Sequence, residues 1–312
     1  VSSGGAATST SISSGTQTIL AAASALYTTI YDGGTQTVSS GGSAISTTIS
    51  SGGTQTVLAD GVATDTTIYD GGSQVVSGGG AATSTSISSG TQTILAAASA
   101  LYTTIYDGGT QTVSSGGSAT STTISSGGTQ TVLADGVATD TTIYDGGSQV
   151  VSSGGAATGT TVSSGGILNV RSGGVLYGTT TLTDNGTLTG DVVTNEGELY
   201  FLNNSSATFT GTLTGTGSLI QEGGITLFSG LLSQDGGITL TNGATMTMDA
   251  LNATVDVTAG SGTTLTLDNG TSLTGSVEGS GNMVITGYSV WYLGGDSTVG
   301  ELTLDSGTVD FR

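Results

Sequence analysis

Apolar residues recur at fixed spacing through the first half of the chain and form three series. One series of isoleucines returns every 18 or 19 residues, a second series of Ile or Val keeps the same interval, and a third consists of alanines. A flexible linker has no reason to keep three series in phase, so the pattern predicts a solenoid. The series begin Ile12, Ile30, Ile49, Ile68; Ile19, Val38, Val57, Val76; and Ala7, Ala25, Ala44, Ala63.

The local pattern around each series is that of short strands. Apolar and polar residues alternate, β-branched types dominate, and Gly-containing turns separate the segments. No 3.6-residue stripe is long enough for a helix. We therefore expect an all-β fold, a right-handed parallel β-helix of about 19 residues per coil, with glycines at the positive-φ corners. At a coil spacing of about 4.8 Å, roughly 16 coils give a length on the order of 75 Å.

A glutamine precedes each member of the second series by two residues, which places both side chains on the inner face. Identical amides stacked coil on coil hydrogen-bond along the axis, so we interpret this series as a structural ladder. Its members are Gln17, Gln36, Gln55, Gln74, Gln92, Gln111, Gln130 and Gln149.

The residue after each isoleucine alternates between Ser and Tyr, outward by strand parity. This produces the exposed series Ser13, Tyr31, Ser50, Tyr69, Ser88, Tyr106, Ser125 and Tyr144. Residues 1–75 also recur as 76–150 with only two changes, Ser3 to Gly78 and Ile45 to Thr120. Duplication alone explains the alternation, while a contact edge formed by the tyrosines remains the functional alternative.

The regular repeat loosens near residue 165. We expect a regular 19-residue-repeat β-helix over 1–165 and degenerate β-helix coils over 166–312 that lead to the end of the folded region. The tail keeps the glycine turns but loses the Gln series and gains bulky residues, which we expect to close the core. These residues are Phe201, Phe209, Phe228, Trp291, Tyr292 and Phe311.

Composition excludes several classes of function. The 312 residues carry a formal net charge of −20 with only two basic residues, Arg171 and Arg312. A phosphate-binding surface needs clustered Lys or Arg, so nucleic acid is not an expected partner. Without His, Cys or Lys, neither the usual nucleophile–base pairs nor His/Cys metal sites can be built. We predict no catalytic residue, no metal and no cofactor.

Acidic residues offer the remaining routes to catalysis. Glu196 and Glu198 are a candidate pair for polysaccharide hydrolysis, and "DSGT" at residues 305–308 matches a short aspartic-protease loop. We interpret the first as surface acids and the second as strand, turn, strand. A polysaccharide-degrading β-helix enzyme is therefore a minor alternative.

Hydroxyl-rich positions supply the surface candidates. "TQT" repeats place two outward threonines on one strand, the array of an ice-binding solenoid, but every fourth coil breaks it with "SQV". Serines beside the Gly-Gly corners either act only as turn residues or accept O-linked sugar. The candidate acceptors are Ser13, Ser39, Ser50, Ser88, Ser114, Ser125, Ser152 and Ser163.

The stretch "SGGSAISTTISSGGTQTVLADGVATDTTIYDGGSQVV" (residues 40–76) resembles the repeats of self-associating autotransporter adhesins of Gram-negative bacteria, of the diffuse-adherence adhesin, TibA and antigen 43 type. The match is strong over residues 1–170, and "STVGELTLDSGTVDFR" looks like the end of such a passenger region. The chain begins inside a repeat at Val1, so we expect a fragment or a processed product.

The resemblance implies a secreted protein of the bacterial cell surface that mediates autoaggregation, biofilm formation and host-cell adhesion or invasion. It implies four partners: copies of itself on neighbouring cells, a host-cell receptor, a bacterial O-heptosyltransferase acting on repeat Ser or Thr, and a separate translocator barrel in the outer membrane. With so few basic residues, however, self-association through salt bridges between copies is not available to this chain.

Overall fold

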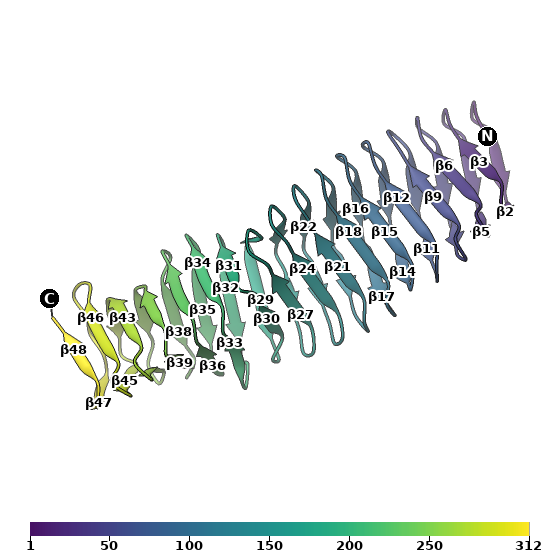
Figure 1. Cartoon of the computed structure of the whole chain (residues 1–312). Helices are drawn as coiled ribbons and strands as arrows, with labels where there is room; N and C mark the ends of the chain where they lie inside the picture. The colour runs from purple at the N-terminus through teal and green to yellow at the C-terminus, as the bar shows by residue number, and fades with distance from the viewer. Residues whose placement is uncertain (312) are drawn as a thin grey trace. The chain divides into compact units, whose positions relative to one another are not determined.

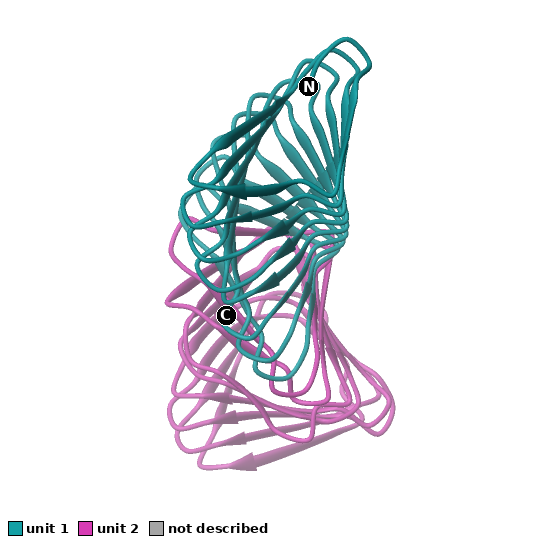
Figure 2. Cartoon of the chain, turned by 90° about the vertical axis from the view of Figure 1, so that its right-hand side faces the viewer, with its two compact units in different colours: residues 1–158 teal, residues 159–312 magenta. Residues whose placement is uncertain are grey.

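The structure is a computed structural model that describes residues 1–311 (Figure 1). These residues form a parallel β-solenoid of about 16 turns, built from strands and turns alone. The chain divides into two compact units, Val1–Thr158 and Gly159–Arg312, which Figure 2 colours separately. Among the described residues, no helix has the length and apolar content needed to cross a membrane.

Each coil of unit 1 contributes one short strand to each of three parallel sheets, here A, B and C. Sheet A contains β1 (Ala6–Thr8), β4 (Ser24–Leu26), β7 (Ser43–Ile45), β10 (Val62–Thr64), β13 (Ala81–Thr83), β16 (Ser99–Leu101), β19 (Ser118–Thr120), β22 (Val137–Thr139) and β25 (Ala156–Thr158). Sheet B contains β2 (Ser11–Ser13), β5 (Thr29–Tyr31), β8 (Thr48–Ile49), β11 (Thr67–Ile68), β14 (Ser86–Ser88), β17 (Thr104–Tyr106), β20 (Thr123–Ile124) and β23 (Thr142–Ile143). Sheet C contains β3 (Thr16–Ile19), β6 (Thr35–Val38), β9 (Thr54–Val57), β12 (Ser73–Val76), β15 (Thr91–Ile94), β18 (Thr110–Val113), β21 (Thr129–Val132) and β24 (Ser148–Val151).

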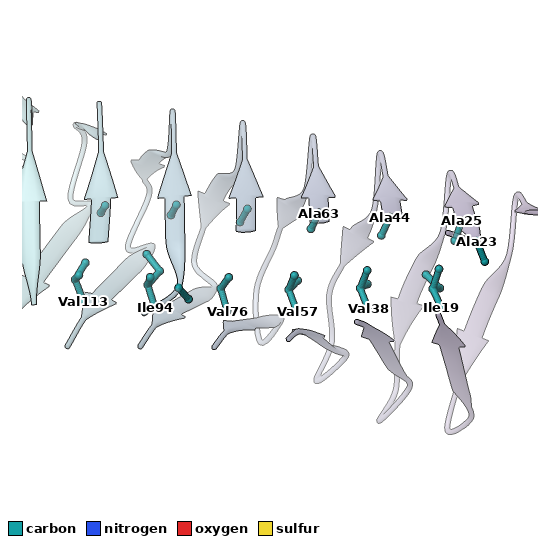
Figure 3. Close-up of a cluster of buried hydrophobic side chains, with 14 residues drawn as sticks. Ile19, Ala23, Ala25, Val38, Ala44, Val57, Ala63, Val76, Ile94 and Val113 are labelled. Atoms are coloured by element: carbon teal, nitrogen blue, oxygen red, sulfur yellow. The ribbon is translucent and has the colours of Figure 1, made fainter. Parts of the chain in front are cut away.

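The three predicted apolar series line the interior of unit 1. Ile12 pairs with Ile30 in sheet B, Ile19 with Val38 in sheet C, and Ala25 with Ala44 in sheet A. The Ile and Val side chains of sheet C point across the interior toward the alanines of sheet A (Figure 3). Alanine is the partner because the narrow interior leaves no room for two branched side chains. Interiors of this kind are closely packed, and these residues are buried.

The glutamine series forms the predicted ladder. From Gln36 onward, each Nε2 donates to the Oε1 of the glutamine in the preceding coil, as Gln55 does to Gln36 at 2.7 Å and Gln74 to Gln55 at 2.6 Å. A buried threonine hydroxyl also donates to each Oε1, as Thr47 does to Gln36 at 3.4 Å. These hydrogen bonds pair the buried glutamine amides and threonine hydroxyls, which would otherwise lie in the core without partners.

The corners differ from the sequence prediction in one respect. Where sheet A turns into sheet B, a residue other than glycine adopts the left-handed conformation in each coil of unit 1. The series is Ser9, Tyr27, Ser46, Asp65, Ser84, Tyr102, Ser121 and Asp140, all with φ between 54° and 57°. Stacking fixes this conformation, since backbone N–H groups such as that of Tyr27 donate to the next coil, here to Ile45 O at 3.0 Å.

Unit 2 is also strand-built and parallel, with longer strands and a bulkier core. Its strands of sheet A are β28 (Val175–Tyr177), β31 (Val192–Asn195), β34 (Thr212–Gly215), β37 (Leu231–Gln234), β40 (Asn252–Thr254), β43 (Ser272–Gly275), β46 (Val290–Leu293) and β48 (Thr308–Asp310). Its strands of sheet B are β26 (Thr161–Val162), β29 (Thr179–Thr183), β32 (Glu198–Leu202), β35 (Ser218–Glu222), β38 (Ile238–Thr241), β41 (Val257–Ala259) and β44 (Val277–Gly279). Sheet C continues as β27 (Ile167–Val170) and β30 (Thr187–Thr189), and a fourth sheet, D, contains β33 (Ala207–Phe209), β36 (Ile225–Phe228), β39 (Thr245–Asp249), β42 (Thr264–Asp268), β45 (Asn282–Thr286) and β47 (Glu301–Asp305).

Four of the six bulky residues of the tail fill the core of unit 2, while Tyr292 is only half-buried and Phe311 lies outside the core. Phe209 and Phe228 lie with ring centroids 6.0 Å apart, and Phe201 packs edge-on against Phe228 at 5.7 Å. Trp291 is buried and donates its indole N–H to Gly275 O at 3.0 Å. Phe311 is 81% exposed and does not close the core.

Candidate functional site

The predicted tyrosines and several predicted serines form one outward column at the end of sheet B. Ser13 pairs with Tyr31, and Ser88 pairs with Tyr106. Beyond β11, the Tyr69 N–H continues the ladder by donating to Ile49 O at 2.8 Å. Ser and Tyr therefore alternate from coil to coil, as the sequence indicated. In unit 1 this sheet B column consists of Ser13, Tyr31, Ser50, Tyr69, Ser88, Tyr106, Ser125 and Tyr144.

The tyrosines of the sheet B column fall into two classes. The Tyr31 hydroxyl lies 2.7 Å from Ser11 Oγ and the Tyr106 hydroxyl 3.0 Å from Ser86 Oγ, each one coil away, so these rings lie across the outer face of the sheet. Tyr69 and Tyr144 face threonine at the equivalent position and are 47% and 48% exposed. The two tyrosines that hydrogen-bond through their hydroxyls thus face serine, and the other two face threonine.

Sequence reasoning missed a second pair of tyrosines. Tyr27 and Tyr102 occupy the corner between sheets A and B, in the coils of Tyr31 and Tyr106, and are 61% and 58% exposed. A tyrosine at positive φ is unusual, because the left-handed region favours Gly and Asn. The available signal was the four-coil recurrence of Ser, Tyr, Ser and Asp at this corner.

The remaining predicted serines lie elsewhere. Ser39, Ser114 and Ser152 begin the corner between sheets C and A, and Ser163 follows β26 in unit 2. Ser13 is exposed, the other predicted acceptors are half-buried, and the Ser152 hydroxyl oxygen is fully buried without a hydrogen-bond partner. The following serine of each pair is the exposed one: Ser14, Ser40, Ser51, Ser89, Ser115, Ser126, Ser153 and Ser164.

Carboxylates accompany the tyrosines. An aspartate follows each tyrosine of the sheet B column, and all four aspartates are exposed: Asp32, Asp70, Asp107 and Asp145. Unit 1 contains no Lys or Arg, so all the charged side chains on its surface are acidic. This surface repels anionic ligands within roughly a Debye length of 8–10 Å.

The acidic groups of unit 2 do not form a hydrolytic pair. Glu196 lies in the turn after β31 and Glu198 begins β32, so a corner separates the two and they do not share a strand face. Glu196 accepts from the Thr216 hydroxyl. Asp305 and Ser306 lie at the turn between β47 and β48, the strand–turn–strand arrangement that the sequence predicted.

Two other groups have shifted pKa values. The backbone N–H and then the hydroxyl of Ser276 hydrogen-bond to Asp256 and lower the pKa of its carboxyl. Tyr200 donates to Glu222, and this bond is the main cause that raises the pKa of the phenol, followed by burial. Asp256 lines a shallow groove with Asp235 and Gln234. Glycoside hydrolysis needs one carboxyl held protonated, and the shift at Asp256 is in the opposite direction.

Comparison with known proteins gives a consistent result. Residues 42–91 and 124–166 match the AIDA family, described as an adhesin of the bacterial autotransporter system and probable stalk. The chain is 55% identical over 141 residues to the autotransporter adhesin/invasin TibA of Escherichia coli O78:H11 (strain H10407 / ETEC), covering 44% of this chain and 14% of TibA. It is 61% identical over 141 residues to the autotransporter CRAC of Citrobacter rodentium (strain ICC168), covering 44% of this chain and 9% of that relative.

A solved structure extends the similarity to nearly the whole chain. The TibC-catalysed, hyper-glycosylated fragment of TibA superposes with a TM-score of 0.61 at 30% identity, covering 98% of this chain and 99% of the fragment. Neither ice-binding proteins nor polysaccharide-degrading enzymes are among these similar proteins. The chain spans only a small part of the full-length relatives it matches.

Proposed function

The chain belongs to the autotransporter adhesins, and we propose that it acts as a non-enzymatic adhesive passenger on the bacterial cell surface. The observation that carries the proposal is the similarity to the TibA fragment over both whole chains. The passenger is secreted through its own translocator barrel in the outer membrane. It supports autoaggregation, biofilm formation and adhesion to or invasion of host cells.

The partners are copies of the chain on neighbouring cells and a receptor on the host cell. The repeated sheet B column offers the same group of side chains at every second coil of unit 1. Contacts that are weak one at a time become strong when many are made together, because each later contact forms within an already joined pair. Tyr31, Tyr69, Tyr106 and Tyr144 are the contact candidates, since rigid aromatic side chains supply large contact areas at low entropic cost.

Beads coated with the purified chain test adhesion directly. They should bind cultured epithelial cells and cluster with one another, whereas beads coated with an unrelated protein of similar negative charge should do neither. The matched variant Tyr69→Ser/Tyr144→Ser places at both positions the residue that alternate coils already carry, and it should reduce binding. Equal binding by both kinds of bead would contradict the adhesive function.

We also propose that a bacterial O-heptosyltransferase of the TibC kind modifies serines at the corners. The hyper-glycosylated TibA fragment supports this, together with the recurrence of one backbone geometry at each corner. Ser13, Ser39, Ser50, Ser88, Ser114, Ser125, Ser152 and Ser163 define the corners. At each corner with paired serines, the second serine is the better acceptor because its side chain is exposed.

The intact mass of the chain after co-expression with the transferase tests the modification. The unmodified chain has a mass of 30.0 kDa, and heptose-sized additions should raise it stepwise. Ser40→Ala/Ser115→Ala should remove more sugar than Ser39→Ala/Ser114→Ala. Alanine is tolerated at this position because Ala21 and Ala96 occupy it in other coils at φ 52°. An unchanged mass for the starting chain would contradict the proposal.

A further inference from the structure

We propose that the sheet B column is a binding surface for an extended, uncharged β-1,4-linked polysaccharide. This inference rests on the proposed adhesive function and names the chemical class of the receptor. It starts from the four tyrosine–aspartate pairs that unit 1 presents at two-coil intervals: Tyr31–Asp32, Tyr69–Asp70, Tyr106–Asp107 and Tyr144–Asp145.

The spacing of the rings is the first argument. Strands of neighbouring coils lie about 4.8 Å apart, so tyrosines two coils apart are separated by about 10 Å. A fully extended β-1,4-linked glycan repeats its orientation every disaccharide, over nearly the same distance. Successive tyrosines of the column therefore meet sugars of the same orientation in one chain, with held and half-exposed rings in alternation. A surface that repeats its residue types at fixed intervals suits a periodic ligand better than it suits a folded protein, whose surface does not repeat.

The second argument is the orientation of the tyrosine rings. The hydrogen bonds from Tyr31 to Ser11 and from Tyr106 to Ser86 keep two rings across the outer face of the sheet. The face of an aromatic ring is electronegative, and the axial C–H groups of a β-linked hexose form a flat, weakly positive surface that stacks on it. Tyr69 and Tyr144 are about half exposed and free to adjust over a bound sugar.

The third argument is the polar groups beside each ring. The aspartate after each tyrosine is exposed, and its carboxylate accepts hydrogen bonds from sugar hydroxyls, which are stronger than neutral ones. Outward threonines such as Thr67 and Thr142 add hydroxyls on the same face. The tyrosine ring is thus suited to the C–H groups of a hexose, and the neighbouring aspartate and threonine are suited to its hydroxyl groups.

Charge selects among glycans. Unit 1 has no Lys or Arg, so its aspartates repel sulfated or sialylated glycans but do not repel a neutral glycan. A basic polypeptide is the competing ligand, because cations also bind tyrosine faces and carboxylates. The two-coil periodicity favours the neutral glycan, and the experiment separates the two.

Calorimetry with the hexamer of β-1,4-linked N-acetylglucosamine tests the proposal on the purified chain. The hexamer should bind, a heparin hexasaccharide should not, and Tyr69→Ser/Tyr144→Ser should weaken hexamer binding at least tenfold. The matched control Tyr288→Ser removes a tyrosine that is 84% exposed in unit 2 and should leave binding unchanged. Circular dichroism confirms that each variant is folded.

Three results would overturn the inference. These are no detectable hexamer binding, hexamer binding that both variants leave unchanged, and a clear preference for polylysine over the hexamer. If the coated beads still adhere to epithelial cells while the hexamer fails to bind, the glycan assignment is wrong and the adhesive function stands. If the beads also fail to adhere, the proposed function fails with it.

Discussion

At the scale of single residues, the glutamine ladder shows what a sequence pattern can establish. Gln and Val two positions apart must share a face, and a buried amide needs a partner, so the identical residue in the next coil is a repeated candidate; the structure adds a buried threonine as a second partner. The bonds from Gln111 to Gln92 at 2.7 Å and from Gln130 to Gln111 at 2.6 Å confirm the pairing of glutamines. Tyr27 and Tyr102 were missed because local chemistry does not mark tyrosine as a positive-φ residue.

Removing one amide of the ladder should destabilise the coils around it. Gln111→Leu keeps the volume but leaves Gln92 Oε1 without one donor and Gln130 Nε2 without one acceptor. The expected cost is about 2–6 kcal/mol, the sum of about 1–3 kcal/mol for each of two buried groups. Hydrogen exchange should become faster in β15, β18 and β21 more than elsewhere, because repeats interact mainly with neighbours. Thr112→Val is the control, since Val75 and Val150 occupy that outer position naturally; equal protection in both variants would contradict the ladder's role.

Tyr200 provides a pH-dependent test at a single residue. Its hydrogen bond to Glu222 raises the pKa of the phenol, so the folded state favours the neutral form. This contribution to stability is present below the ordinary tyrosine pKa of about 10 and is lost as pH rises through the higher folded-state value. In NMR titrations of labelled tyrosine, Glu222→Gln should lower the Tyr200 pKa. A Tyr200 pKa that the substitution leaves in place would show that Glu222 is not the cause.

At the scale of the strand and corner, the two glycines of a Gly-Gly pair are needed for different physical reasons. Gly127 has φ +86°, and a Cβ there would make only an ordinary van der Waals contact, with Gly108 N at 3.7 Å. Gly128 has an ordinary φ, but a Cβ there would lie 2.4 Å from Ile105 O in the coil below. The sequence predicted turns at these pairs, while the close approach between coils became visible only once the stacking was known.

The two glycines should therefore respond differently to alanine. Gly127→Ala should cost about 1–2 kcal/mol, the strain of a left-handed alanine. Gly128→Ala should cost several kcal/mol, because backbone of the preceding coil must move. Urea denaturation of the two variants compares them directly. A larger loss of stability for Gly127→Ala would indicate that backbone conformation, and not coil stacking, limits this corner.

At the scale of the whole molecule, charge governs how copies meet. The net charge of −20 was evident from composition, and so was the fold class, because three series in phase admit few architectures. The sequence also predicted the members of the sheet B column, but it did not separate the two kinds of tyrosine within it. The alternation of Ser and Tyr has the same appearance whether it is a duplication remnant or a contact surface, and only exposure and hydrogen bonding distinguish the two kinds of tyrosine.

Self-association should increase with salt. Like-charged copies repel over about 30 Å at 0.01 M ionic strength and about 8 Å at 0.15 M, so screening allows closer approach. Light scattering of the unmodified chain should show larger assemblies as sodium chloride rises across this range. Magnesium chloride at matched ionic strength is the control that separates screening from cation bridging. Assemblies that dissolve as salt rises would indicate attraction between opposite charges, which this composition does not provide.

Gain of function in a cell tests the central claim most directly. The chain, fused to an autotransporter barrel and displayed on a bacterium that neither aggregates nor adheres, should make the cells settle faster and bind epithelial cells. Cells that display the barrel alone are the control. Settling and adherence above the control are the predicted result. Display of the folded chain without any gain in either property would contradict the account of this solenoid as an adhesive passenger.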